Sequence, residues 1–127
     1  MGDRANIAVI DSGERVYLYT HWKGADLPSI LHNAMNEGRD RWDDPAYLTR
    51  VIFCSMMGDD KGVSGYGISP HIGDNEYPVI VVDCDKEQIY LEPTEIFEIR
   101  GENPLFSFER FAAEKAVTWR TLDTGRT

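Results

Sequence analysis

The sequence predicts an α+β fold: an antiparallel sheet of about five strands with helices packed on it, in the order ββααβββ(β)α. Three observations lead to this class. A strand–turn–strand pattern occupies residues 6–22, two helical patterns follow at 27–38 and 45–58, and strand-like runs return after residue 65. Helices that are grouped, instead of alternating with strands, are typical of α+β domains. Strands joined by tight turns are expected to pair antiparallel.

The first hairpin is indicated by residue type and by its turn. Residues 6–10 are a short apolar run, and residues 15–22 are rich in aromatic and β-branched side chains, which suit a pleated sheet. Between them, Gly13 can adopt the positive φ that a tight turn needs. Side chains alternate along a strand, so Tyr17, Tyr19 and His21 share one face. If this face is exposed, the three rings can stack against a ligand. We expect instead that a later helix covers the face and that the three side chains belong to the core.

Both helical patterns carry signals at their two ends. In the first, Asp26 stands at the N-cap position and Gly38 follows the last apolar residue. In the second, Asp44 precedes Pro45 at the first helical position, and Gly58 ends the pattern. The apolar residues recur at helical spacing, which predicts one buried stripe on each helix. The predicted stripes are Leu27, Ile30, Leu31, Ala34 and Met35, then Leu48, Val51, Ile52, Ser55 and Met56.

The second half of the sequence reads as further strands. Residues 65–69 form a weaker strand that Pro70 ends. Residues 77–82 are almost continuously apolar, which predicts a central strand, and residues 88–91 return from it after a short turn. Residues 95–99 alternate and are predicted to be an edge strand.

A last helix is predicted over residues 104–115, where Phe108 and Phe111 lie at helical spacing and Ser107 is a candidate cap. This is the helix that we expect to cover the aromatic strand face. The polar residues from about 120 to 127 are predicted to fray. We find no repeat and no boundary, so residues 1–127 are predicted to form a single domain.

The charge limits the classes of partner. The net charge of −9 would repel phosphate backbones, so direct DNA or RNA binding is disfavoured. A basic protein partner, mimicry of nucleic acid, or simple solubility are the open interpretations. No segment resembles a signal peptide or is long enough to cross a membrane, and the two cysteines form no disulfide framework. These features predict a cytoplasmic protein without membrane contact.

We find no pattern that fixes a reaction. The acidic pairs at residues 43–44 and 59–60 are explained by a helix cap and a turn, and no serine or cysteine has the spacing of a nucleophile with its base. We therefore expect no metal and no cofactor, and the balance favours a non-enzymatic protein.

One set of residues could recognise a ligand. Arginines near aromatic side chains suit carboxylate or phosphate groups, and His21 could act as an acid or base. The candidate ligand-binding residues are Arg4, Tyr19, His21, Arg41, Trp42 and Tyr66. The competing interpretation is an internal network, in which Arg4 and Arg41 pair with Asp3, Asp43 or Asp44.

Several stretches of the sequence resemble those of a known family. They are residues 1–7 (MGDRANI), 17–22 (YLYTHW), 39–45 (RDRWDDP), 66–69 (YGIS) and 75–78 (NEYP). Together they resemble a family of small uncharacterised proteins from bacterial and phage genomes. The resemblance covers about residues 1–92. It implies a phage or bacterial setting but no mechanism.

The leading hypothesis is a non-enzymatic binding protein of phage or bacterial origin, which could interfere with a host system through a protein partner or a small anionic ligand. A homodimer is compatible with it. The first alternative is a small enzyme that uses His21 as acid or base, with Arg4 and Arg41 holding an anionic substrate. The second is an acidic mimic of nucleic acid, which needs the carboxylates of residues 74–102 aligned on one face.

Overall fold

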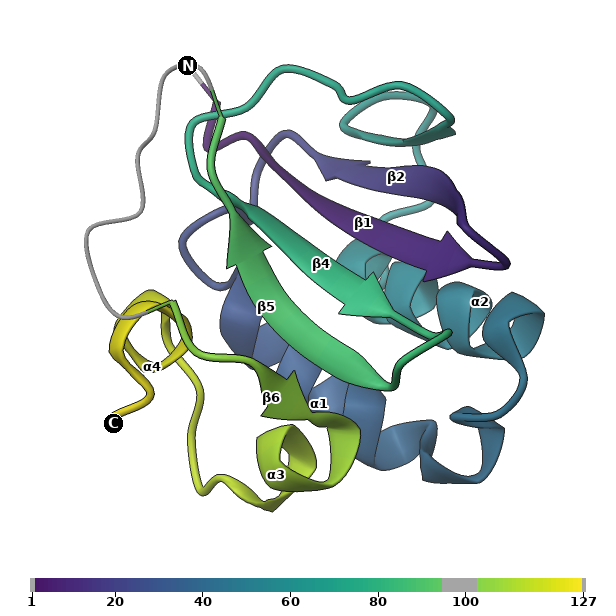
Figure 1. Ribbon diagram of the computed structural model, residues 1–127. Helices are drawn as coiled ribbons and strands as arrows, with labels where there is room; N and C mark the ends of the chain where they lie inside the picture. The colour runs from purple at the N-terminus through teal and green to yellow at the C-terminus, as the bar shows by residue number, and fades with distance from the viewer. Residues whose placement is uncertain (1, 95–102, 127) are drawn as a thin grey trace.

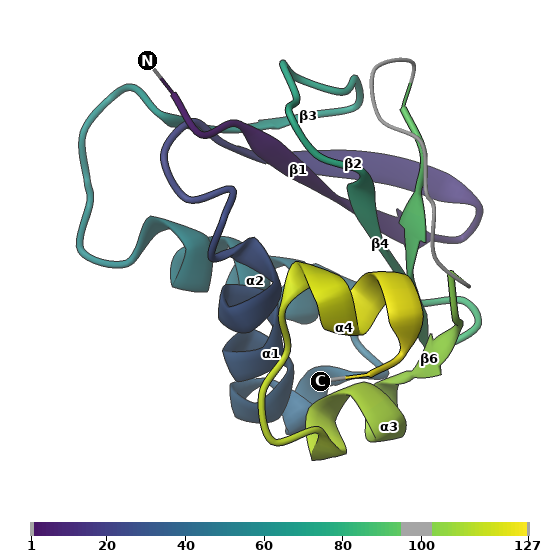
Figure 2. The same ribbon diagram turned by 90° about the vertical axis from the view of Figure 1, so that its left-hand side faces the viewer.

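The fold is an α+β sandwich of one sheet and one layer of helices (Figure 1). The computed structural model describes residues 2–94 and 103–126. Six strands form the sheet: β1 Ala5–Asp11, β2 Glu14–Thr20, β3 Tyr66–Ser69, β4 Val79–Asp83, β5 Gln88–Glu92 and β6 Phe106–Ser107. The helices are α1 Leu27–Glu37, α2 Pro45–Met57, α3 Phe108–Ala113 and α4 Trp119–Thr124, with a 3-10 turn η1 at Arg39–Arg41. Figure 2 shows the helices together on one side of the sheet.

The sheet has the order β3-β2-β1-β4-β5-β6, and it is mixed. Four neighbouring pairs are antiparallel, as predicted, but β1 and β4 run parallel, with Ile7 opposite Ile80. The prediction of a purely antiparallel sheet is therefore wrong at its centre. The reason is the connection after β3, which is no tight turn. It crosses the sheet and delivers β4 beside β1 instead of beside β3.

The first hairpin is confirmed with its turn. β1 and β2 pair from Ala5↔Thr20 to Asp11↔Glu14, so Ser12 and Gly13 alone form the connection. Both have positive φ, 55° and 77°, which matches the right-handed twist of a two-residue hairpin. The Asp85 carboxylate, in the β4–β5 turn, accepts hydrogen bonds from the backbone N–H groups of Ser12 at 2.7 Å and Gly13 at 2.9 Å. These hydrogen bonds join the turn of the β1–β2 hairpin to the turn of the β4–β5 hairpin.

The core lies between the sheet and the helices. β1 contributes Ile7 and Val9 to it, and α1 and α2 bury their predicted stripes, apart from half-buried Ile30, Val51 and Ser55. Asp26 and Asp44 occupy the predicted N-cap positions, but neither side chain accepts a capping hydrogen bond. Ser107, by contrast, does cap α3 and accepts a hydrogen bond from the Arg110 N–H at 3.0 Å.

The C-terminal region differs from the prediction in two ways. The predicted helix over 104–115 is shorter, because Phe106 and Ser107 first pair with β5 as β6. Residues 119–124 then form α4, where a frayed end was predicted, and Leu122 of α4 is fully buried. The Thr118–Thr121 capping box starts this helix. The predicted edge strand at 95–99 lies outside the described residues.

No helix in residues 2–94 and 103–126 combines the length and apolar character that a membrane crossing requires.

Candidate functional site

The six candidate residues do not form one pocket. Arg4, Tyr19 and His21 lie together where β1 begins and β2 ends, and the Tyr19 hydroxyl is 2.9 Å from Nδ1 of His21. Tyr66, on the edge strand β3, packs against the core on the helix side of the sheet, with the Lys23 Nζ atom 5.7 Å from its ring centre. Arg41 ends the η1 turn and Trp42 follows it, close to α3.

Trp42 is an anchor of the core. Its side chain is only 9% exposed, its indole N–H donates to the Met35 carbonyl at 3.0 Å, and it contacts Phe108 edge to face. Arg41 stacks on Tyr47 and lies 3.8 Å from the Asp44 carboxylate. Burial of the indole removes Trp42 from any ligand site, which corrects the single-pocket prediction.

Arg4 is engaged inside the protein. Its Nε donates to Glu76 at 2.9 Å and its Nη1 to Asp74 at 3.5 Å. The hydrogen bond to Glu76 raises the pKa of Arg4, and the same bond lowers the pKa of Glu76. Of the predicted internal network, the pair of Arg41 with Asp44 is present, whereas Arg4 pairs with Asp74 and Glu76 instead of the predicted aspartates. An anionic ligand would have to displace Asp74 and Glu76.

The neighbouring polar residues hold the connection between β3 and β4 in place. Asn6 is fully buried, and its amide exchanges hydrogen bonds with the backbone of Gly73 and Asp74. The Tyr77 hydroxyl donates to the Asp3 carboxylate, which also accepts from the Ala25 N–H at 2.8 Å. Residues from 1–7, 17–22 and 75–78 thus meet at this corner, where they hold one another in place.

The sheet face opposite the helices is left uncovered by the described helices (Figures 1 and 2). The structure corrects the expectation that the helix carrying Phe108 and Phe111 covers Tyr17 and Tyr19, because both phenylalanines belong to the core on the other side. The register aligns Tyr17, Ala8, Val81 and Tyr90 in one row across four strands. Ala8 and Val81 are fully buried, and Tyr17 and Tyr90 pack against them while staying half-exposed.

A charged pair lies on this same face. Both terminal nitrogens of Arg15 donate to the Glu92 carboxylate at 2.7 Å, and Nη1 is also 3.5 Å from the Tyr17 hydroxyl. The hydrogen bonds to Glu92 raise the pKa of Arg15 above its ordinary value. Such a two-point contact holds both side chains in one geometry. Beside Glu92, a hollow of about 460 Å³ is lined by residues 72–75, Val79, Pro93 and Thr94.

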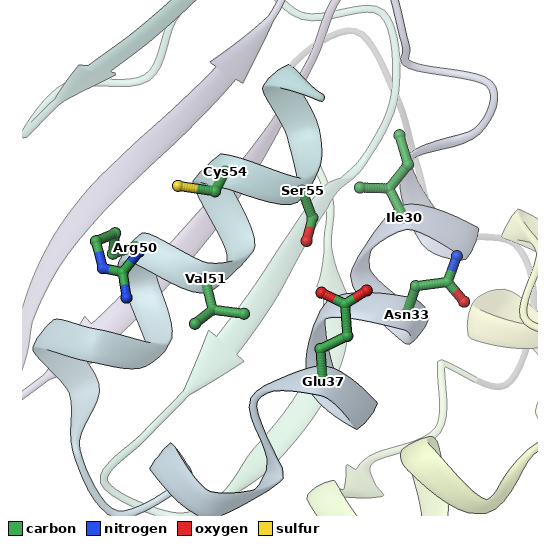
Figure 3. A pocket seen from close by; sticks show the side chains of 7 residues that line it. All are labelled: Ile30, Asn33, Glu37, Arg50, Val51, Cys54 and Ser55. Atoms are coloured by element: carbon green, nitrogen blue, oxygen red, sulfur yellow. The ribbon is translucent and has the colours of Figure 1, made fainter. Parts of the chain in front are cut away.

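A second hollow of about 440 Å³ lies on the helix layer, between α1 and α2 (Figure 3). We call it the helix groove. Its lining residues are Ile30, Asn33 and Glu37 of α1 and Arg50, Val51, Cys54 and Ser55 of α2. Val51 and Ser55 were predicted to point inward, but they lie at the edge of the buried stripe and therefore line this groove.

The two cysteines differ in environment, and this gives a first prediction. Cys54 is exposed beside the helix groove. Cys84 is half-buried, and burial, reinforced by Asp11, raises its pKa to about 12. Because only the thiolate is nucleophilic, we expect iodoacetamide at pH 8 to modify Cys54 and leave Cys84 unmodified in the folded protein. Mass spectrometry of peptides measures this. Equal modification of both cysteines before unfolding would contradict it.

Within residues 2–94 and 103–126, no group of three or more His, Cys, Asp or Glu side chains is placed to hold a metal ion. Comparisons with family models, with curated proteins and with solved structures gave no match, so the proposals below rest on the geometry of this chain.

Proposed function

We propose that this protein is a non-enzymatic binding protein, and that its uncovered sheet face binds a protein partner. The observation that carries the proposal is the position of the helices, which leaves Tyr17, Tyr19 and Tyr90 half-exposed on one face. Tyrosine and arginine are enriched at protein interfaces, because they combine apolar area with hydrogen-bonding groups.

The size of the face is consistent with an interface. Six strands separated by about 4.8 Å span about 24 Å, and the four inner strands, of five to seven residues each, are about 17–23 Å long. The flat area of the face is thus at most about 400–550 Å², below the 800 Å² or so that each partner contributes to a standard interface, which fits a small interface. The hollow beside Glu92 adds the concavity that a protruding side chain needs.

The net charge of this protein indicates what kind of partner it binds. With a net charge of −9, long-range forces favour a basic partner. Arg4 and Arg15, at or beside this face, are both paired with carboxylates. This pairing favours a protein partner over the small anionic ligand.

The two alternative functions have weaker support. The Tyr19–His21 hydrogen bond orients the imidazole, as an acid–base role would require, but Arg4 is neutralised beside it and Arg41 lies elsewhere. A nucleic-acid mimic needs free, aligned carboxylates. Among the described residues of the 74–102 region, Asp74 and Glu76 bind Arg4, Glu92 binds Arg15, and Asp85 binds backbone N–H groups.

Site-specific photo-cross-linking in the cells that make the protein tests the proposal. A benzophenone amino acid replaces Tyr17 in one variant and Tyr90 in another. Tyr47, which is 49% exposed on α2, serves as the matched control. We expect Tyr17 and Tyr90 to give one common cross-linked protein that is missing at Tyr47. The proposal is wrong if the two face positions give no product, or the same products as Tyr47.

A further inference from the structure

The two edges of the sheet differ in character. β6 has two residues and leads directly into α3, whereas β3 has four residues and pairs with β2 on one side only. Proteins usually protect an exposed edge with charged side chains or with a covering element. β3 contains no charged residue, and the side chain of its Ile68 is 57% exposed. A further strand can therefore add at this edge.

The register of β3 shows which of its backbone groups face outward. The His21 N–H donates to the Gly65 carbonyl at 2.8 Å, and bonded and non-bonded pairs alternate along an antiparallel ladder. Gly67, opposite Tyr19, therefore also faces β2. The residues at 66 and 68 direct their N–H and carbonyl groups to the free edge. In the part of the chain that the structure describes, no backbone hydrogen bond reaches these outward groups.

The outward groups are complementary to those of a second copy of this chain. When two β3 strands pair antiparallel about a twofold axis at Gly67, Tyr66 of each copy lies opposite Ile68 of the other. Every outward N–H and carbonyl group then has a partner. Gly67 lies opposite Gly67 of the second copy, where no side chain stands between the two backbones. The exposed Ile68 side chain gains Tyr66 of the second copy as its cross-strand neighbour.

The local charge also favours a second copy over a basic partner at this edge. The chain has a net charge of −9, but residues 61–73, which include β3, carry no acidic side chain. Two copies that meet at β3 therefore bring no carboxylates of this segment together. A basic segment would find no carboxylate in it to bind.

We propose that two copies of this chain pair through β3 and form one continuous sheet. The twofold axis of an antiparallel pair is perpendicular to the sheet, so the uncovered faces of both copies lie on the same side. Their joined flat area of about 800–1,100 Å² reaches the 800 Å² or so that one partner contributes to a standard interface. Only this consequence rests on the function proposed above. The pairing itself needs no binding partner, so its failure would leave the cross-linking result at Tyr17 and Tyr90 unaffected.

Sedimentation equilibrium of the purified protein tests the pairing. We expect a monomer–dimer equilibrium whose dissociation constant falls when NaCl is raised from about 50 to 500 mM, because salt screens the repulsion between two copies of net charge −9. Association through opposite charges would instead weaken with salt, and that result would contradict the proposal. A protein that stays monomeric at about 0.5 mM in the high-salt buffer would overturn it, because even weak strand pairing is populated at that concentration.

Ile68→Pro tests whether the edge of β3 is the contact. Proline removes the outward N–H of this residue in both copies, and an edge strand tolerates it because the bonds to β2 come from other residues. We expect dimerisation to weaken at least about tenfold, the effect of losing two hydrogen bonds. Ile68→Val is the matched control, since it keeps the N–H and a branched side chain, and it should dimerise like the natural protein. Equal dimerisation of the proline variant would rule out this edge.

Charges at Gly67 test the position of the twofold axis. A Cβ atom there meets no heavy atom within 4 Å, so Gly67→Asp and Gly67→Lys should both fold, which far-ultraviolet circular dichroism verifies. Each variant alone places two like charges opposite one another and should dimerise about fivefold more weakly. A mixture of the two should recover dimerisation, because opposite charges then meet. Tyr47→Asp makes the same change of net charge on α2 and should have little effect. A mixture no tighter than either variant alone would show that Gly67 does not face its own copy.

Discussion

Replacing Trp119 by alanine is expected to lower the free energy of unfolding by about 3 kcal/mol, the low end of the range for removal of a large aromatic side chain. The indole stacks on Tyr77 with ring centres 4.8 Å apart, and its N–H donates to the Gly24 carbonyl at 2.9 Å. It thereby links α4 to residues far away in the sequence. Loss of the indole should also free Leu122 from its buried position.

Urea unfolding followed by circular dichroism measures this effect without relying on tryptophan fluorescence. Trp22→Ala is the matched control, because that indole is 52% exposed, and we expect it to cost less than 1 kcal/mol. If Trp119→Ala were as stable as the natural protein, residues 119–124 would be a loosely attached end, as the sequence alone suggested.

Phe111→Ala should have the larger effect, a loss of about 4 kcal/mol. Phe111 is fully buried in α3 and meets Phe106 and His32 edge to face. Alanine would leave a cavity at the point where α3 closes the core over α1. A domain of this size has a total stability of about 5–15 kcal/mol, so the variant should be close to unfolding at 37 °C.

Comparing the thermal unfolding of Phe111→Ala with that of Leu105→Ala tests whether the loss of stability depends on the burial of the side chain that is removed. Leu105 is 58% exposed and close in the sequence, so its truncation should leave the melting temperature nearly unchanged. A similar, small shift for both variants would show that α3 is not part of the core, and would reopen the possibility that it covers the opposite face of the sheet.

The elements that were predicted from sequence are those with local signals. α1 and α2 follow from apolar residues at helical spacing between a proline and a glycine, and the hairpin follows from Gly13. The parallel pairing of β4 with β1 is accompanied by a contact over a long sequence distance, because Asn6 binds the connection at Gly73 from 67 residues away. No local pattern encodes such a contact. The near-continuous apolar character of both strands was the available signal, since such runs are typical of parallel strands.

The candidate site was predicted only where its residues are close in the sequence. Tyr19 lies on β2 and His21 follows the end of this strand, so a spacing of two residues in extended chain brings their side chains together. The partners of Arg4 were missed because Asp74 and Glu76 are about seventy residues away. α4 was missed because its stability comes from the stack on Tyr77, although Thr118 and Thr121 already had the spacing of a capping box.

The parallel pair at the centre of the sheet joins the part of the sequence before residue 58 to the part after it. β1 belongs to the first part and β4 to the second, and each of these strands lies between one strand from its own part and one strand from the other part. Neither part can assemble a closed core alone, because α1 and α2 precede residue 58, whereas β4, β5 and the aromatic residues of α3 follow it. A cut in the exposed turn at residues 59–62 would therefore yield two fragments that depend on each other for structure, which makes this turn the natural place to divide the protein into a complementing pair.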